Sequence, residues 1–541
     1  MVSRRTLLIA LGAFALLLVF ELPGSALIEP DEARYAEIPR EMLAAHDLVT
    51  PRLDGARYYE KPPLLYWANA ASFTLLGESP YAARLAARES ALITAALIAW
   101  ALGGELGLWA ALILLSAPLS FVLGRYNVTD GVLTAAMTLA LVGMRDFLRR
   151  RERGQGAALA LAMLGLGTGL SVLAKGLIGI VLPGLVFLLY IALVGEWRRL
   201  RELILSPAPI VLLAVAAPWF VMMERRNPGF SQVFFIREHF QRFATNEAKR
   251  EAPFYFFVLA FIAGMLPWTI PFGAWAGTAI VRSRAALRER RDELLFALWL
   301  VVIVVFFSAS KSKLLTYILP AFPAAAALAA RAMLAPASNW RRALLVYAAL
   351  LTLLLGGGLA VALARGLLAP FGATAFAAAG IVAIVAGAWL AVALAPRGVR
   401  PAMLAAAAGW GGLYLACVLA LPRLSHELAT DDLARAAAAV PGAQVVAYRN
   451  YPQGFAWTLR ASIPVVDFTG ELASDGARPA ALFWSEDDFW RHWHEGGPLA
   501  VVLRRRALAD FRARADPVPV TVAQNNTYLV VANVPTPTNA P

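Results

Sequence analysis

The sequence predicts a polytopic α-helical membrane protein, with about thirteen transmembrane helices and a small α/β domain at the C-terminal end of the chain. Of the 541 residues, 60% are hydrophobic and 16% are charged, whereas soluble proteins average roughly 45–50% apolar residues. The apolar residues form long runs up to Leu421, and a mixed composition follows Pro422. Alternate short loops between the runs are basic, which is typical of a membrane protein with many spans.

The predicted spans follow from run length, since a bilayer core of about 30 Å needs roughly 20 apolar residues per helix. An odd number of spans places the two chain termini on opposite sides of the membrane. The predicted spans are 6–24, 87–103, 106–124, 131–148, 157–174, 177–195, 204–223, 253–275, 293–309, 314–332, 343–364, 372–395 and 401–421.

Loop charge predicts the orientation. If the N-terminus is cytoplasmic, five short cytoplasmic loops carry arginine, as the positive-inside rule predicts. These loops contain Arg149–Arg153, Arg198–Arg199, Arg282–Arg291, Arg341–Arg342 and Arg397–Arg400. They also account for much of the net charge of +13, so the basic balance indicates topology and no nucleic-acid partner.

Two segments on the outer side, 25–86 and 224–252, are too long to be turns. They belong to a predicted membrane domain over residues 1–424. A predicted soluble domain over residues 425–541 follows, because a helical pattern from Asp431 to Ala439 precedes several Val-rich runs. Thr430 is the expected N-cap of that helix.

The most charged outer stretch is Glu29 to Glu37, directly after the first apolar run. Asp31, Arg34 and Tyr35 share one face of a helix at i, i+3 and i+4, and Glu32 adds a second carboxylate. Asp31 could simply stabilise the positive end of the helix dipole. The alternative is a polar ligand site, since charge at membrane depth is costly unless it is paired or used.

Three further outer stretches carry the same kind of residue. Tyr58, Glu60 and Lys61 precede the pair Pro62-Pro63, which fixes the backbone and begins a helix. An interfacial aromatic belt accounts for the tyrosine without a function, whereas a rigidly held lysine suits a phosphate ester. Asp130 follows the third span and is either a helix cap or a second acidic group of the same cavity.

The remaining candidates come from later loops. His239 and Arg242 share a helical face in segment 224–252, and Lys313 and Tyr317 lie at an outer membrane edge. Lysines at such an edge often only snorkel. Zinc takes three or four protein ligands, and Glu60 with His239 supplies two.

These stretches together resemble the GT-C superfamily of polyprenyl-phosphate-dependent glycosyltransferases. The similarity is greatest to the bacterial lipid A 4-amino-4-deoxy-L-arabinose transferases, which are related to the protein O-mannosyltransferases. The motifs that carry it are Asp31-Glu32-Ala33-Arg34-Tyr35-Ala36-Glu37, Tyr59-Glu60-Lys61-Pro62-Pro63-Leu64, Asp130 and Ser310-Lys311-Ser312-Lys313-Leu314. The plan of about thirteen helices, a large first outer loop and an outer C-terminal domain also matches.

The resemblance implies residue roles. Asp31 and Asp130, with Glu32, are the expected catalytic acids. Zinc, if present, would lie between Glu60 and His239. For the donor phosphate and lipid, the resemblance implies Lys61, Arg34, Tyr35 and Tyr58 as ligands. Arg242, Lys313 and Tyr317 are further expected ligands because of their own positions on the outer side.

The resemblance also implies the reaction. The donor is a sugar on undecaprenyl phosphate, the expected acceptor is a phosphate of lipid A, and single displacement inverts the sugar. The chain would lie in the bacterial inner membrane with a periplasmic C-terminal domain, in contact with membrane lipids. The alternatives are transfer to a hydroxyl of a protein, glycan or lipid, with Asp31 as general base, and a flippase or transporter of polyprenyl-linked sugars. Transporters usually place polar groups in broken helices at mid-membrane, whereas charge here gathers at the outer surface.

Overall fold

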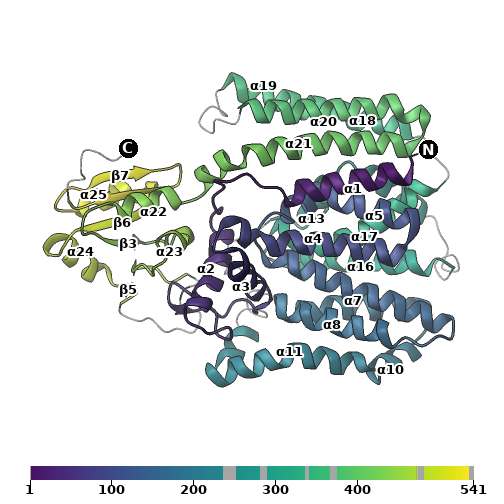
Figure 1. Ribbon diagram of the computed structural model, residues 1–541, viewed down its shortest axis with the longest axis horizontal. Helices are drawn as coiled ribbons and strands as arrows, with labels where there is room; N and C mark the ends of the chain where they lie inside the picture. Colours follow the sequence, from purple (N-terminus) through teal and green to yellow (C-terminus); the bar gives the residue numbers. More distant parts are fainter. Residues whose placement is uncertain are drawn as a thin grey trace.

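The structure, a computed structural model, describes residues 2–235, 252–280, 289–335, 340–365, 374–470, 472 and 481–534. A bundle of helices occupies one end of the elongated molecule and a domain with a β-sheet the other (Figure 1). The N-terminus and α10 (Arg198–Ile204) lie at the end remote from the sheet (Figure 1). The start of α1 and the β-sheet therefore lie at opposite ends of the molecule.

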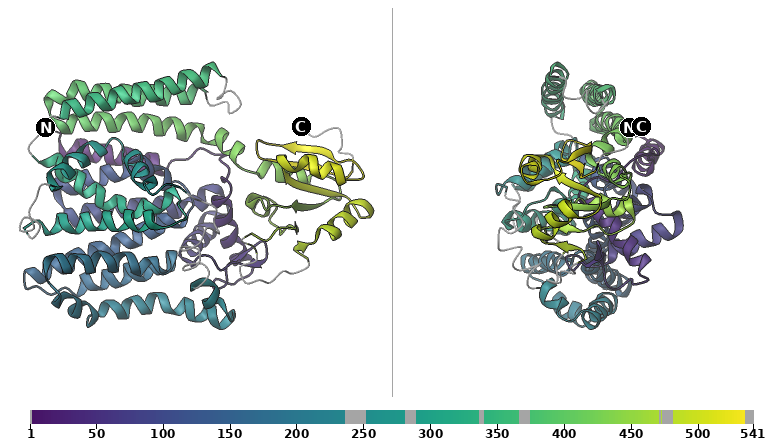
Figure 2. Two further views of the ribbon diagram at one scale, coloured as in Figure 1. Left: turned by 180° about the vertical axis from the view of Figure 1, so that it is seen from behind. Right: turned by 90° about the vertical axis from the view of Figure 1, so that its left-hand side faces the viewer.

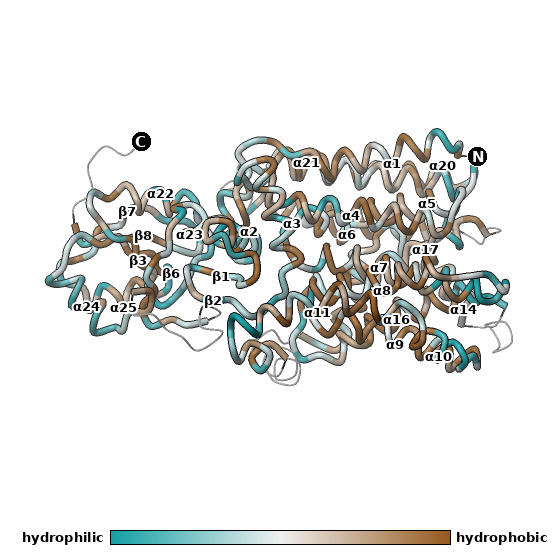
Figure 3. Tube along the Cα trace, turned by 60° about the horizontal axis from the view of Figure 1, so that its bottom comes forward, coloured by the Kyte–Doolittle hydropathy of each residue, from teal (hydrophilic) through white to brown (hydrophobic). Residues whose placement is uncertain are grey.

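The bundle confirms the predicted multi-span plan. Nine helical segments in the described part of the chain are long and apolar enough to cross a membrane. Hydrophobic residues dominate along α7, α8 and α16 (Figure 3). The bundle helices are α1 (Arg4–Val19), α4 (Pro80–Leu102), α5 (Gly104–Ser116), α6 (Pro118–Leu123), α7 (Thr129–Glu152), α8 (Ala158–Lys175), α9 (Ile178–Val194), α11 (Pro207–Arg226), α13 (Phe256–Gly264), α14 (Thr269–Ile280), α16 (Arg291–Ala309), the 3-10 turn η2 (Leu315–Ala321) with α17 (Phe322–Leu334), α18 (Trp340–Leu351), α19 (Gly357–Ala364), α20 (Thr374–Leu394) and α21 (Val399–Leu428).

Two predicted spans are broken. The expected span 106–124 is divided between α5 and α6 at Pro118, and the span 253–275 is divided between α13 and α14 beside Pro267. Proline has no backbone N–H and clashes with the preceding turn, so a straight helix ends there.

Glycines set the closest approach within the bundle. A Cβ on Gly167 would lie 2.3 Å from the backbone nitrogen of Ala140, and one on Gly165 would lie 2.4 Å from the carbonyl oxygen of Ala208. Only glycine lets α8 contact the backbones of α7 and α11 this closely.

The first outer loop folds over the bundle. It contains α2 (Asp31–Ala44), a hairpin of β1 (Arg52–Leu53) and β2 (Ala56–Arg57), and α3 (Leu64–Leu76). Helix α2 begins at Asp31 and α3 begins directly after Pro63, as the sequence predicts.

The C-terminal domain packs end to end with the bundle (Figure 2). Helix α21 continues to Leu428, so the change to the C-terminal domain falls a turn later than residue 424. The sheet has the order β5-β4-β3-β6-β8-β7, with β8 antiparallel to both neighbours and the other pairs parallel. The elements are α22 (Asp431–Ala438), β3 (Gln444–Tyr448), α23 (Gln453–Leu459), β4 (Val465–Val466), β5 (Phe483–Trp484), α24 (Glu486–Glu495), β6 (Leu499–Arg504), α25 (Leu508–Arg514), β7 (Val520–Gln524) and β8 (Tyr528–Ala532).

Candidate active site

Asp31 is the first residue of α2, at the outer end of the bundle. Its carboxylate lies 3.5 Å from the Arg34 guanidinium, and 31% of the side chain is exposed. The helical face predicted from their spacing is therefore formed. A long ion pair with an accessible carboxylate leaves Asp31 able to meet a ligand.

Glu32, the next residue, has the opposite environment. Its carboxylate is fully buried and accepts four hydrogen bonds: two from Arg84 at 2.9 and 2.6 Å, and one each from the backbone N–H groups of Asn127 and Ile28 at 3.0 Å. Arg84 also bonds Glu21 at 2.6 Å. Because these donors occupy the carboxylate, Glu32 holds α2 against α4 and the start of α7; we assign it this role in place of the expected catalytic one.

Two buried asparagines complete this attachment. The Asn69 amide donates to the carbonyl oxygen of Tyr35 and to the Asn127 side chain, both at 3.0 Å, and the Asn127 amide donates to the carbonyl oxygen of Glu32 at 3.3 Å. The turn that carries Asp31 is thereby fixed relative to α3 and to the segment just before α7. We call Glu32, Arg84, Asn69 and Asn127 the buried clamp.

Tyr35 lies at the centre of the site. Burial raises the pKa of its phenol above the usual range, and the carboxylates of Asp31, Glu60 and Asp130 raise it further, while Arg34 lowers it. The ring lies 6.2 Å from that of Tyr66. Tyr66 and Asn69, both on α3, contact Tyr35, so the structure brings the start of α2 and the helix after the second stretch together.

The second stretch borders this centre. The Tyr58 hydroxyl donates to the Glu60 carboxylate at 3.3 Å, and the Lys61 ammonium lies 3.8 Å from that carboxylate. Lys61 also donates to the Glu60 carbonyl oxygen at 3.1 Å. Since α3 begins just beyond Pro62 and Pro63, the ammonium is held close to a rigid backbone.

Asp130 lies in the first turn of α7 and pairs with Lys175, the last residue of α8, at 2.5 Å. Both side chains are largely buried. The Lys175 ammonium also lies 4.4 Å from the centre of the Tyr317 ring, which is a cation–π distance. Asp130 is thus half of a buried ion pair whose cation contacts an aromatic residue of η2.

The later candidates have varied positions. The Lys313 ammonium donates to the carbonyl oxygen of Ser310 at 2.6 Å, just beyond the end of α16. Arg242 and His239 lie outside the described residues, so their expected roles stay predictions.

Zinc binding also stays a prediction. In the part of the chain that the structure describes, Glu60 belongs to no cluster of three or more metal-ligating side chains. The Lys61 ammonium beside it would repel a dication, so Glu60 as placed does not fit zinc on its own.

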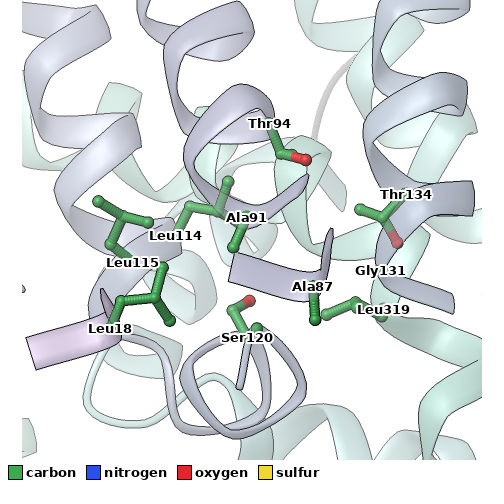
Figure 4. Close-up of a pocket in the computed structure, with 11 residues that line it drawn as sticks. Leu18, Ala87, Ala91, Thr94, Leu114, Leu115, Ser120, Gly131, Thr134 and Leu319 are labelled. Carbon is green, nitrogen blue, oxygen red and sulfur yellow. The ribbon is translucent and has the colours of Figure 1, made fainter. Parts of the chain in front are cut away.

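A small apolar cavity lies beside the first turn of α7 (Figure 4). Its volume is about 20 Å³. Its lining consists of Gly131, Thr134 and Ser120 together with alanine and leucine side chains. The space suits about one water molecule and is too small for a sugar or a prenyl chain.

Buried carboxyl groups of the outer loop hold the C-terminal domain. Glu29 accepts hydrogen bonds from the Thr430 hydroxyl at 2.7 Å and the Gly454 N–H at 2.5 Å. Asp54 accepts from the Ile463 N–H at 2.8 Å. Burial raises the pKa of the Asp54 carboxyl to about 7, and burial beside Glu37 raises that of Glu41 to about 8.

Sequence reasoning missed Lys175 and the buried clamp. Lys175 stands alone between two apolar runs, and a lone charge there signals a buried partner. No local signal marks Arg84 or Asn127 as partners of Glu32.

Comparison with known proteins gives consistent matches. The family described as dolichyl-phosphate-mannose-protein mannosyltransferase matches residues 4–234. The undecaprenyl phosphate-alpha-4-amino-4-deoxy-L-arabinose arabinosyl transferase of Pectobacterium atrosepticum is 32% identical over 562 residues, which cover 96% of each chain. Arabinosyl transferase 1 of Sodalis glossinidius is 37% identical over 325 residues, which cover 59% of this chain and 57% of that one.

A solved structure shares the whole fold. ArnT from Cupriavidus metallidurans bound to undecaprenyl phosphate superposes with a TM-score of 0.84 and 28% identity. The superposition covers 98% of this chain and 99% of that chain. The membrane bundle and the C-terminal domain are therefore both shared.

Proposed function

Because the chain belongs to the family of undecaprenyl phosphate-α-4-amino-4-deoxy-L-arabinose arabinosyl transferases, we propose that it transfers this sugar from undecaprenyl phosphate to a phosphate of lipid A. The observation that carries the proposal is the outer site, where Asp31 at the first turn of α2 keeps a partly exposed carboxylate 3.5 Å from the Arg34 guanidinium. A solved relative with the same overall fold binds undecaprenyl phosphate, the lipid that this donor would carry.

The site lies on the outer side of the bundle, with the C-terminal domain. The arginine-rich helix α10 and the N-terminal end of α1 lie at the end of the bundle remote from this site (Figure 1). We therefore place the N-terminus in the cytoplasm and the C-terminal domain in the periplasm of a bacterial inner membrane.

Transfer breaks the bond between the anomeric carbon and the phosphate oxygen of the donor, and the electron pair leaves with the lipid phosphate. Cationic groups stabilise the charge that develops on this oxygen. We assign this role to Lys61, which lies just before α3, and Lys313, Tyr58, Tyr317 and Arg242 are further predicted contributors.

The acceptor determines what the acids do. A phosphate acceptor is anionic at neutral pH, so its oxygen attacks the anomeric carbon directly and inverts it without a general base. Asp31, with its accessible carboxylate, then orients the acceptor or pairs with the ammonium of the sugar. Asp130 fixes Lys175 beside Tyr317.

A second candidate function is supported by the match of residues 4–234 to protein mannosyltransferases. A hydroxyl acceptor on a protein, glycan or lipid must lose a proton, and Asp31 would then serve as the general base. The two candidates differ in the acceptor, and the matched mannosyltransferase family also differs in the sugar and the lipid named for its donor.

Mass spectrometry of lipid A tests the proposal. Cells that express the chain should yield lipid A with added aminoarabinose, and cells that lack it, or that carry Asp31→Asn, should not. Unchanged lipid A together with a glycosylated protein would favour the second candidate. Transfer by the purified protein in detergent would exclude transport as the sole activity.

A further inference from the structure

The segment that joins α1 to α2 lies along the end of α21, the helix that leads into the C-terminal domain. The Ala26 N–H donates to the Ser425 hydroxyl oxygen at 2.9 Å, and the Glu29 N–H donates to the carbonyl oxygen of Leu428 at 3.1 Å. Leu428 is the last residue of α21. The backbone just before Asp31 is therefore attached at the point where the C-terminal domain begins.

The Glu29 side chain reaches into the C-terminal domain itself. Its carboxylate accepts a hydrogen bond from the Thr430 hydroxyl at 2.7 Å. It accepts two more from backbone N–H groups at the start of α23, from Gly454 at 2.5 Å and from Gln453 at 3.0 Å. Hydrogen bonds to an ionised acceptor are roughly twice as strong as neutral ones, so three donors of the C-terminal domain hold this carboxylate firmly.

Two features of the C-terminal domain indicate that the contact is specific. A Cβ on Gly454 would lie 2.7 Å from Oε1 of Glu29 and 2.6 Å from Oγ1 of Thr430, so only glycine lets this N–H approach the carboxylate. Thr430 is the N-cap residue of α22, as its sequence position predicts, but its side chain makes no capping hydrogen bond. Its hydroxyl is directed to Glu29 instead.

The turn that carries Asp31 is thus anchored on two sides. The bundle holds Glu32 through the buried clamp, and the C-terminal domain holds Glu29. Helix α23 also packs against α2 (Figure 1). Asp31 lies between these two anchors in the sequence, and its own side chain is 31% exposed. Loss of the Glu29 anchor would therefore change where the Asp31 carboxylate lies without altering Asp31 itself.

We infer that Glu29 is a positioning residue for transfer, through which the C-terminal domain fixes the first turn of α2 and the place of the Asp31 carboxylate. This inference rests on the proposed function, in which Asp31 acts in transfer. Misplacement of a reacting group by about 1 Å can reduce a rate by roughly 100-fold. The C-terminal domain then determines the rate of transfer as well as the stability of the protein.

Transfer kinetics on the full-length protein in detergent test this role. Thr430→Val removes the hydroxyl donor at nearly constant volume, and Gly454→Ala places a methyl group against the Glu29 carboxylate. Each should reduce kcat by about 10–100-fold and leave KM for the lipid donor unchanged, at a temperature well below that of melting. Thr430→Ser keeps the hydroxyl and should restore the wild-type kcat. Thr521→Val is the matched control, since Thr521 is exposed on β7 of the same domain, and it should transfer as wild type does.

Hydrogen exchange measures the order of α2 with no donor present. The amides of residues 31–36 should exchange about tenfold faster in Gly454→Ala than in wild type, while exchange in α8 stays the same. Unchanged exchange in α2 would overturn the inference.

A lower melting temperature with unchanged kcat in Thr430→Val and Gly454→Ala would also overturn it, because the contact would then serve stability alone. Equal loss of kcat in Thr430→Val and Thr430→Ser would do the same. If wild type transfers no aminoarabinose, the proposed function fails, whereas faster exchange in Gly454→Ala still assigns the placement of α2 to Glu29.

Discussion

Adjacent carboxylates of the outer loop have opposite environments. Glu32 is fully buried and accepts four hydrogen bonds, whereas Asp31 is 31% exposed and lies 3.5 Å from the Arg34 guanidinium. The buried clamp around Glu32 fixes the position of α2, and we propose that the open site around Asp31 meets the substrate. We expect variants of the buried clamp to change mainly stability and variants of the open site to change mainly activity. Each variant below alters one of these two regions.

Removal of Glu32 should have the largest effect on stability. Glu32→Ala leaves the Arg84 guanidinium buried with one carboxylate fewer, and breaking a buried pair costs about 3–5 kcal/mol. We expect a much lower melting temperature in detergent and a low yield. Glu89→Ala is the control, since Glu89 is exposed on α4, the helix that carries Arg84. Equal melting temperatures of the two variants would contradict the role of the clamp.

Lys61→Ala should leave the fold intact and reduce the rate of transfer by about 100–1,000-fold. A loss of this size is usual when one group that stabilises the developing negative charge is removed. Turnover of purified enzyme with the lipid donor measures it. Lys311→Ala replaces an exposed lysine at the outer edge and should retain activity. Near-normal turnover by Lys61→Ala would remove this residue from the site.

Lys175→Met tests whether the buried pair belongs to the open site. It leaves the buried Asp130 carboxylate without its cation, which costs about 3–5 kcal/mol of stability. If the pair also orients the site, transfer by the protein that remains folded should fall by about 10–100-fold, the order of effect expected when a positioning group is lost. If Asp130→Asn restores stability to Lys175→Met but not transfer, the pair serves catalysis; if transfer returns as well, the pair is structural.

Asn69→Ala removes one link of the clamp without removing a charge. The Asn127 side chain loses a donor, and an unsatisfied buried amide costs about 1–3 kcal/mol. We expect a modest fall in melting temperature with a fall in kcat and little change in KM. A change in KM alone would show that Asn69 does not position Asp31.

The smallest effect should be a pH dependence. A carboxyl whose pKa is higher in the folded protein than in the unfolded chain binds more protons when folded. Its contribution to the free energy of unfolding is therefore fully present below about pH 4 and is lost as the pH rises through the pKa of the folded state. For Asp54 that value is about 7, so wild type should melt at a lower temperature at pH 8 than at pH 5. Asp54→Asn keeps an acceptor for Ile463 and should narrow this difference; an unchanged difference would exclude Asp54 as the source.

The sequence predicted most of what depends on local signals. Proline and acidic residues marked the starts of α2 and α3, run length marked the bundle, and Val-rich runs marked β3, β6, β7 and β8. Partners joined only by the tertiary fold were not predictable: Asp130 and Lys175 lie 45 residues apart and Glu32 and Arg84 lie 52 apart. Asp31 and Glu32 were both expected to be catalytic, because sequence alone does not show which of two adjacent carboxylates is buried.

The most direct test of the central claim measures transfer rate and melting temperature together for Asp31→Asn. Asp31 is partly exposed and outside the clamp, so the melting temperature should stay within about 2 °C of wild type while transfer from undecaprenyl phosphate falls to background. Near-normal transfer by a folded Asp31→Asn protein would contradict the assignment of the open site.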